Sequence, residues 1–269
     1  MPPFITFLTD FGLKDPFVGT CHGVIKRLAP EAEILDITHG IPPQEVLQGA
    51  LVLANALRYM PKAINLAVVD PGVGGSRRAL ALRTRDGDYF VGPDNGLLVP
   101  AADRTGGIEA VRELTNRRYA LEHVSPTFHG RDLFAPAAAH LALGVPLEEL
   151  GDPVDPGALT RLELPRPELT DGRIRATVLY VDRFGNVQLN VRRAHAERAR
   201  IEPGMRVELE LGGERYYAIA TRTFTEAKPG DIVLYEDSYE NIAVAINRGS
   251  AAEMFGAAPG QEVVIEFDT

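Results

Sequence analysis

A change of hydrophobic pattern near the middle of the chain limits its fold more than any other feature. Before residue 150, short apolar runs alternate with amphipathic stretches of helical period, whereas after residue 172 only short β-like runs occur. The proline-rich residues 151–172 between them have the composition of a linker. We therefore predict an α/β domain over residues 1–150 with a central, mainly parallel sheet, and a smaller all-β, barrel-like domain over residues 173–269.

The first half has the order of strands and helices that builds a parallel sheet. Strands are predicted over 5–9, 34–37 and 64–69, and a hairpin over 80–83 and 89–91 that turns at Asp86-Gly87. Helices are predicted over 16–28, 44–59 and 132–143. Asp15 and Asp132 are expected to be the N-cap residues of the first and third helices, and Gly144 is expected to end the third.

The second half is punctuated by Gly, Pro and Asp at short intervals, as in a small barrel or sandwich. Its predicted strands are 174–181, 187–191, 206–211, 216–220, 232–235, 242–246 and 262–267.

Composition excludes several classes of protein. The net charge of −9 argues against a nucleic-acid partner, which usually requires a basic surface. A single cysteine, Cys21, excludes an internal disulfide framework and a cysteine-based zinc site. The sequence contains neither an apolar stretch near the ~18 residues that span a bilayer nor a recognisable signal peptide, so we expect no membrane partner and a cytoplasmic location.

Two acidic residues follow the carboxyl ends of predicted strands, where ligands bind in open α/β sheets. Asp10 follows the first strand, and Asp70 follows the third and precedes the glycine-rich segment 71–78. A glycine-rich turn with a capping aspartate explains this segment about as well as a ligand site does. A phosphate-binding loop is disfavoured, because the Gly-x-x-x-x-Gly-Lys order is missing and no helix is predicted directly after the segment.

Three further clusters combine polar and aromatic groups. His129 lies on a loop before a predicted helix, where a histidine can act as an acid, a base or a donor. Residues 182–186 bring a carboxylate, an aromatic ring and an amide to a strand break, and residues 247–250 follow a late strand. Each also has an ordinary structural explanation, such as a surface histidine or a β-bulge. Structural roles are expected for the other histidines, which are His22, His39, His123, His140 and His195.

Seven segments, taken together and in this order, resemble the S-adenosyl-L-methionine (SAM) hydroxide adenosyltransferase family, whose relatives include the 5′-fluoro- and 5′-chloro-adenosine synthases. The resemblance covers essentially the whole chain. The segments are LTDFG (8–12), DITHGIPPQ (36–44), VVDPGVGGSRR (68–78), VGPDNGLL (91–98), TFHGRD (127–132), DRFGNVQLN (182–190) and INRGSAA (246–252).

The resemblance implies an enzyme that hydrolyses SAM to adenosine and L-methionine by attack of water or hydroxide on the ribose C5′. The Asp–Arg–His set of the family maps onto Asp70, Arg77 and His129. The halide-using relatives carry other residues at the aspartate and histidine positions, so these residues favour hydrolysis. Whether Asp70 or His129 takes the proton of the nucleophile stays open at this point. No metal or cofactor is expected, because Arg77 supplies the positive charge that a metal would otherwise supply.

The resemblance also implies substrate contacts and a quaternary structure. Asp10 maps onto the ribose-contacting aspartate, and Asp182 and Asn186 map onto the pair that contacts the methionine amine and the adenine edge. Family members are trimers with the ligand between the N-terminal domain of one subunit and the C-terminal domain of the next. The segment 238–242 lacks the glycine and the acidic residue usual there. The remaining predicted contacts are Phe128, Gly130, Phe184, Ser238, Tyr239, Asn247, Arg248 and Ser250.

Three alternatives to a hydrolase belong to different classes. The first is a halogenase-type enzyme that displaces methionine from SAM with a halide. The second is a metal-dependent phosphoesterase that holds Mg²⁺ with oxygen ligands from Asp10, Asp15, Asp70 and Asn95. The third is a non-catalytic protein that binds adenosine or SAM.

Overall fold

The computed structural model describes residues 3–267, which divide into two compact units at residue 162. The first unit comprises residues 1–162 and the second residues 163–269. Each unit is described by itself below.

A seven-stranded sheet forms the centre of the first unit, in the order β2-β1-β3-β5-β4-β6-β7. The pairs β1–β2, β1–β3 and β3–β5 are parallel, whereas β4–β5, β4–β6 and β6–β7 are antiparallel. The predicted α/β class is thus confirmed, and the sheet is mixed. The strands are β1 Phe4–Thr9, β2 Glu33–Thr38, β3 Ile64–Val68, β4 Ala79–Thr84, β5 Tyr89–Pro93, β6 Ile108–Glu113 and β7 Asp152–Pro153.

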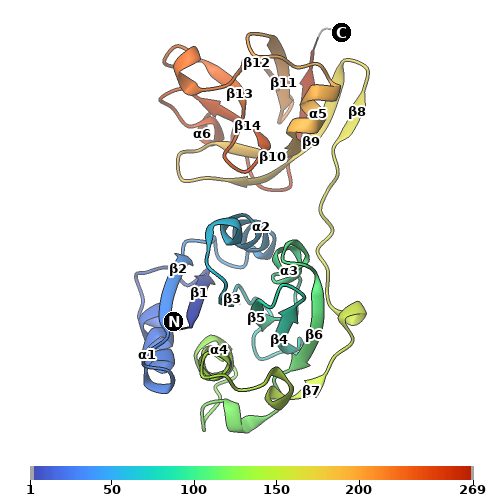
Figure 1. Ribbon diagram of the computed structural model, residues 1–269. Helices are drawn as coiled ribbons and strands as arrows, with labels where there is room; N and C mark the ends of the chain where they lie inside the picture. Colours follow the sequence, from blue (N-terminus) through green and yellow to red (C-terminus); the bar gives the residue numbers. More distant parts are fainter. Residues whose placement is uncertain (1–2, 268–269) are drawn as a thin grey trace. The chain divides into compact units, whose positions relative to one another are not determined.

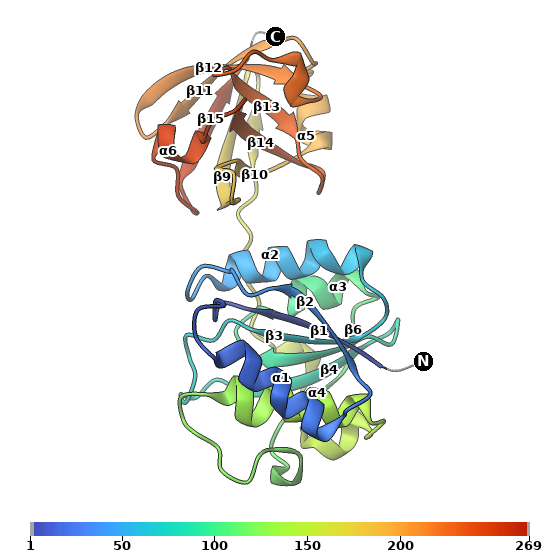
Figure 2. The ribbon, with the colours of Figure 1, turned by 90° about the vertical axis from the view of Figure 1, so that its left-hand side faces the viewer.

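Helices cover both faces of this sheet and bury an apolar core against each (Figure 1, Figure 2). One face carries α1 (Phe17–Leu28) and α4 (Ala135–Ala142), and the other carries α2 (Val46–Ala56) and α3 (Val99–Arg104). All five residues of β3 are buried, as the non-alternating apolar pattern predicts for a central strand. The carboxyl ends of β1 and β3 therefore lie side by side and present Asp10 and Asp70 at one edge.

Three helix starts differ from prediction. The N-cap residue of α1 is Pro16 rather than Asp15, and it makes no side-chain capping bond. The second helix begins at Val46, because Gln44 has a left-handed backbone with φ of 69°. Asp132 lies within a π-helical turn, Gly130–Phe134, that leads into α4, so it is not an N-cap residue.

Other local predictions for the first unit agree with the structure. Residues 79–84 and 89–93 pair as the predicted antiparallel hairpin, and β4 rather than a helix follows the segment 71–78. Gly144 follows α4 with φ of 84°, the conformation that glycine adopts most easily at a helix end. Cys21 is free, and burial raises the pKa of its thiol to about 12.

The second unit is a closed β-barrel of seven strands. The ring runs β10-β14-β13-β12-β11-β15-β9, and a further pairing of β9 with β10 closes it. All neighbouring strands are antiparallel except β12 and β13, and the apolar side chains inside form one core. The strands of the ring, all predicted, are β9 Arg173–Val181, β10 Val187–Arg192, β11 Arg206–Leu211, β12 Glu214–Thr221, β13 Ile232–Glu236, β14 Asn241–Ile246 and β15 Glu262–Glu266.

Short elements complete the two units. In the proline-rich segment 151–172, β7 pairs with β6 of the first unit and β8 (Glu168–Thr170) pairs with β9 of the barrel. Two short helices, α5 (Arg193–Arg198) and α6 (Ala251–Phe255), pack on the barrel. Within residues 3–267, no helix combines the length and apolar character needed to cross a bilayer.

Candidate active site

Three side chains that are far apart in the sequence meet at the carboxyl edge of the first sheet. Arg77 donates from Nε to both carboxylate oxygens of Asp70, at 2.9 and 3.0 Å, and from Nη2 to Oδ2. The same Nη2 lies 2.8 Å from Nδ1 of His129. The side chains of Asp70 and Arg77 are only 5% and 11% exposed, and the guanidinium lies over the Phe134 ring. The predicted set Asp70, Arg77 and His129 is therefore assembled as one hydrogen-bonded unit.

A close approach of two loops explains how this unit forms. Gly74 has φ of 75°, and a Cβ atom there would lie 2.2 Å from the carbonyl oxygen of Pro126. Only glycine allows that contact, which joins the loop after β3 to the loop that carries His129. The glycine-rich segment thus serves to bring Arg77 and His129 within bonding distance.

The hydrogen bond between Arg77 and His129 determines the protonation of the histidine. A guanidinium can only donate, so Nδ1 of His129 must accept and its proton must lie on Nε2. Burial, together with the positive charge of Arg77, lowers the pKa of His129 below its usual 6.5. His129 is therefore a neutral imidazole at pH 7, and its remaining polar atom is an Nε2–H donor.

A pocket of about 290 Å³ opens beside these residues and contains several of the predicted contacts. Asp10, Asp70, Phe128, His129 and Gly130 line it, and the first two come from the ends of neighbouring parallel strands. The pocket also has lining residues that the sequence analysis did not single out, namely Phe11, Pro43, Gln44, Val68, Pro71, Val73 and Thr127.

Gln44 was missed because a positive φ at a non-glycine residue leaves no pattern in the sequence. Its backbone N–H donates to Asp10 Oδ2 at 2.9 Å, so one carboxylate oxygen of Asp10 is fixed by the main chain. A left-handed backbone at a non-glycine residue costs conformational free energy, and such residues are concentrated at functional sites. Pro43, which precedes Gln44, also lines the pocket.

Aromatic rings form one wall of this pocket. Phe128 packs edge-to-face against Phe11 and Phe17, with ring centroids 5.8 and 5.2 Å apart. A Cβ atom at Gly130 would lie 3.0 Å from Phe11 Cζ, so glycine leaves room that a serine side chain would occupy. The pocket therefore combines an apolar wall with the carboxylates of Asp10 and Asp70 and the imidazole of His129, and Arg77 bonds to the last two from behind them.

A second pocket, of about 360 Å³, lies on the barrel and is lined by Asp182, Phe184 and Asn186. Asp182 Oδ2 accepts from Asn186 Nδ2 at 2.7 Å, and its Oδ1 accepts from the backbone N–H groups of Phe184 and Asn186. These bonds hold the carboxylate and the amide side by side and leave the Phe184 ring 76% exposed. The arrangement presents polar edges beside an aromatic face.

Ser238 and Tyr239 line the same barrel pocket, on the loop between β13 and β14. Asp237, which the sequence analysis did not identify, organises that loop. Its Oδ1 accepts from the backbone N–H groups of Tyr239 and Asn241, at 2.8 and 3.0 Å, and its Oδ2 accepts from Gln188. Glu240 in this loop has φ of 68°, a conformation that glycine would adopt more easily.

Asn247, Arg248 and Ser250 do not line that pocket. Asn247 Nδ2 donates to the carbonyl oxygen of Ala227, and Ser250 Oγ accepts from Glu253 N–H as the N-cap of α6. Both side chains therefore have structural bonds within the barrel. Arg248 has φ of 62° in the turn before that helix.

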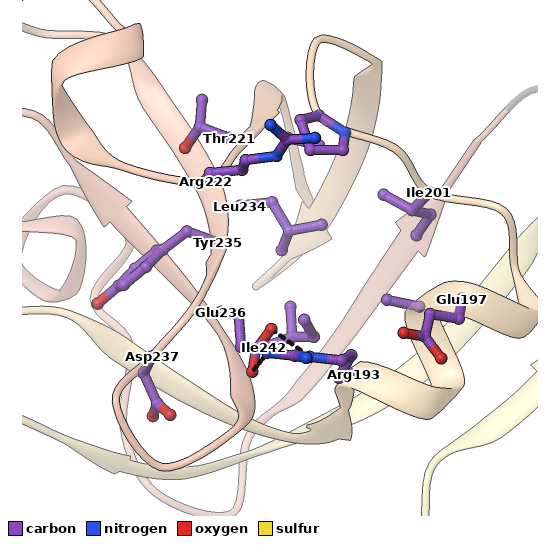
Figure 3. A pocket seen from close by; sticks show the side chains of 13 residues that line it. Arg193, Glu197, Ile201, Thr221, Arg222, Leu234, Tyr235, Glu236, Asp237 and Ile242 are labelled. Atoms are coloured by element: carbon purple, nitrogen blue, oxygen red, sulfur yellow. Dashed lines mark hydrogen bonds and ion pairs between the residues drawn. The ribbon is translucent and has the colours of Figure 1, made fainter.

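A further cavity, of about 710 Å³, also lies on the barrel and contains none of the predicted site residues. Arg193 and Glu236 face one another across its floor and form two hydrogen bonds of 2.7 and 2.6 Å (Figure 3). Ile201, Leu234 and Ile242 line part of it, and the charged residues Glu197, Arg222 and Asp237 line it as well (Figure 3). We assign no ligand to this cavity.

The magnesium alternative has no support in the geometry. Among residues 3–267, ligand atoms of three His, Cys, Asp or Glu side chains lie within 4.8 Å of one another only at His22, Asp36 and His39. Asp10, Asp15 and Asp70 therefore do not converge. Asn95 donates to the Val69 carbonyl oxygen and accepts from Leu97 N–H, so its amide stabilises a turn.

Comparison with known proteins identifies the family. The sequence matches the SAM hydroxide adenosyltransferase N-terminal domain over residues 5–151 and its C-terminal domain over residues 176–264. The chain belongs to this family.

Individual relatives agree with this assignment. A protein of Salinispora tropica named (R)-S-adenosyl-L-methionine hydrolase is 50% identical over 263 residues, 97% of each chain. A fluorinase of an Actinoplanes species is 29% identical over 98% of this chain and 97% of its own. The crystal structure of an uncharacterized conserved protein from Thermotoga maritima matches with a TM-score of 0.89 and 37% identity, over 97% of this chain and 99% of that one.

Proposed function

We propose that the protein hydrolyses SAM to adenosine and L-methionine by attack of water or hydroxide on the ribose C5′. The observation that carries this proposal is the hydrogen-bonded unit of Asp70, Arg77 and His129 beside the pocket that contains Asp10. The names of the similar hydrolases support it further.

The chemistry of the substrate explains what this site has to supply. Loss of methionine converts a sulfonium cation into a neutral thioether, so the leaving group needs no proton. The barrier lies in the nucleophile, because water is weak and hydroxide is scarce at pH 7. A fixed positive charge in a site that excludes bulk water stabilises hydroxide, and Arg77 is permanently charged and nearly buried.

The three residues take different roles in this proposal. Arg77 stabilises the nucleophile by charge, and Asp70 holds the guanidinium in place through the bonds to Nε and Nη2. His129 orients the nucleophile by donating from Nε2–H. Because the Nδ1 lone pair of His129 already accepts from Arg77, the imidazole has no site left to take a proton. Asp70 is therefore the better candidate for the base.

Four further predicted residues contact SAM in this proposal: Asp10 from the N-terminal domain, and Asp182, Phe184 and Asn186 from the C-terminal domain of the neighbouring subunit. Asp10, fixed by the Gln44 N–H, accepts from the ribose hydroxyls and sets C5′ in line with the nucleophile. Asp182 and Asn186 bind polar edges of the substrate, and the exposed Phe184 ring offers a face on which a purine can stack.

Halogenation is the alternative that the fluorinase relative raises. A halide site has to accept an anion without a fixed negative charge nearby. The carboxylate of Asp70 lines the pocket, and it disfavours a halide more than it disfavours water. This charge supports hydrolysis.

We expect oxygen-18 from labelled water to appear in adenosine and not in methionine. Attack at C5′ forms the new C–O bond on the ribose, and the thioether leaves without oxygen. Mass spectrometry of both products after incubation of SAM with the enzyme tests this. Label in methionine, or formation of 5′-chloroadenosine in a chloride buffer, would contradict the proposal, and the absence of any turnover would favour a non-catalytic binding protein.

We expect kcat to be constant near neutral pH and to fall only below pH 6.5. The pKa of His129 is lowered from 6.5, so the neutral form persists to lower pH than in an unfolded chain. Protonation at Nδ1 would break its bond to Arg77. For the same reason, the stability that the neutral His129 contributes is fully present above pH 6.5 and is lost as the pH falls through the lowered pKa.

A pH profile of kcat for the native enzyme and for His129→Gln checks this expectation. The low-pH decline should disappear in His129→Gln and persist in His123→Gln, which alters an exposed histidine of the same loop region. A decline that begins well above pH 6.5 and depends on His129 would mean that the imidazole is instead stabilised in its charged form.

Our proposal also covers the oligomeric state of the protein, its cellular location and the absence of a cofactor from the reaction. The family resemblance supports a homotrimer with its sites at subunit interfaces, and sedimentation analysis with a mass of 29.2 kDa per chain would test the trimer. We also propose a cytoplasmic location, and a reaction without a cofactor in which Arg77 supplies the positive charge that a metal would otherwise supply.

A further inference from the structure

A cluster outside the proposed active site brings together two imidazoles and a carboxylate. His22 lies on α1, Asp36 on the edge strand β2, and His39 directly after that strand. Asp36 Oδ1 lies 2.9 Å from His22 Nε2 and 3.1 Å from His39 Nε2. The cluster therefore connects helix α1 to the edge of the sheet.

His39 is the buried member of this cluster, and one of its ring nitrogens has no hydrogen-bond partner. Its side chain is 3% exposed, and its Nδ1 lies 2.9 Å from Thr9 Oγ1. Nε2 is close to Asp36 Oδ1 but makes no hydrogen bond with it or with any other atom among residues 3–267. A buried polar atom without a hydrogen bond is costly, and this one is directed at a carboxylate and a second imidazole.

The hydrogen bond at Nδ1 of His39 leaves its Nε2 available to a metal ion. With the proton on Nδ1, the ring donates to Thr9 Oγ1 and directs the Nε2 lone pair toward the cluster. Metal-binding histidines almost always donate their other ring N–H in this way. Thr9 Oγ1 is itself fixed, because it accepts from Phe11 N–H at 3.1 Å.

The spacing of the donor atoms fits a small tetrahedral ion. Ligand atoms at ~2.0–2.1 Å from a tetrahedral Zn²⁺ lie about 3.3 Å apart, and two of the three separations here are 2.9 and 3.1 Å. The third pair is within 4.8 Å. Two imidazole nitrogens select a transition metal rather than Mg²⁺ or Ca²⁺, which prefer oxygen ligands.

We propose that His22, Asp36 and His39 bind a divalent transition-metal ion of the Zn²⁺ type. The side chains of His22 and Asp36 are 31% and 40% exposed, so the ion enters from solvent and keeps a water ligand in the fourth position. The site is structural: the ion ties α1 to β2 and, through His39, to the turn that carries Asp10. The His39 carbonyl oxygen accepts from Gly12 N–H in that turn, at 2.8 Å.

Cobalt titration of the tag-free, full-length protein tests this proposal without measuring turnover. After removal of metals with EDTA and then of the chelator, CoCl₂ is added and visible absorption is recorded. We expect one Co²⁺ per chain with the d–d bands of a four-coordinate site, displacement by ZnCl₂, and a rise in the thermal unfolding midpoint. Binding should weaken at least about 100-fold in His22→Gln and in Asp36→Asn, since loss of even an outer-shell partner costs ~10–100-fold.

His22→Gln carries the test because it changes a partly exposed residue, whereas a change at the buried His39 could unfold the protein. His123→Gln removes an imidazole outside the cluster and should leave Co²⁺ binding unchanged. The proposal is overturned if no saturable binding occurs, if His22→Gln binds Co²⁺ like the native protein, or if a thiolate-to-cobalt band assigns the metal to Cys21. None of these outcomes bears on the proposed hydrolysis, which uses other residues.

Discussion

Arg77→Lys is expected to lower kcat for SAM by about 100- to 1,000-fold, the effect of losing one transition-state donor in comparable sites. Lysine keeps the positive charge but has no planar fork, so it cannot bond both oxygens of Asp70 and also donate to His129. The native guanidinium does all of this with Nε and Nη2. The variant therefore keeps the positive charge and removes its hydrogen-bond geometry, so a loss of kcat measures the effect of the geometry.

Arg78→Lys is a matched control for this variant. Arg78 is the adjacent residue and also pairs with an aspartate, donating from Nε to Asp94 Oδ2 at 2.8 Å. Its Nη2 donates to the carbonyl oxygen of Ala158, and neither Ala158 nor Asp94 lines the pocket that Asp70 and His129 line. Kinetics at saturating SAM, with circular dichroism to verify folding, should give a large loss of kcat for Arg77→Lys and a small one for Arg78→Lys. Equal kcat values in the two variants would remove Arg77 from the chemistry.

The sequence predicted the regular elements better than their boundaries. Apolar runs such as Ile64–Val68 and the seven barrel strands are visible because burial sets their pattern. Val99–Arg104 and Ile108–Glu113 were missed, because a six-residue helix and a strand with one buried residue, Val111, have little periodic signal. Asp132 shows how tertiary structure overrides local preference. It resembles an N-cap, yet its buried carboxylate accepts from Ser125 N–H and pairs with Arg131.

The residue types of the site could be predicted, but most of its bonds could not. Asp10 and Asp70 follow from the rule that ligands bind at the carboxyl ends of strands. The bond between Arg77 and His129 depends on the packing of Gly74 against Pro126, which no local pattern encodes. The proton position on His129, and hence its role, follows only from that bond. Gln44 and Asp237 act through local loop geometry, which neither composition nor residue spacing encodes.

Asp70→Asn is expected to lower kcat by at least about 100-fold. A positioned general acid or base usually contributes about 10²–10⁴-fold to the rate, and the expected loss is the lower limit of that range. The amide removes the carboxylate that pairs with Arg77 and places an NH₂ group against the guanidinium. Because both side chains are nearly buried, breaking the pair should also reduce the free energy of unfolding by about 3–5 kcal/mol. Kinetics and urea unfolding must therefore be measured on the same preparation.

Asp94→Asn separates catalysis from stability in this experiment. Asp94 is as buried as Asp70 and pairs with Arg78, so its amide variant should lose a similar amount of stability and little kcat per folded molecule.

The double variant Asp70→Asn/Arg77→Lys should lose much less activity than the product of the single losses, because the effects of groups that act as one unit are not additive. Independent, multiplicative losses would mean that Asp70 and Arg77 act on the substrate separately. Equal kcat losses in Asp70→Asn and Asp94→Asn would reduce Asp70 to a stabilising residue.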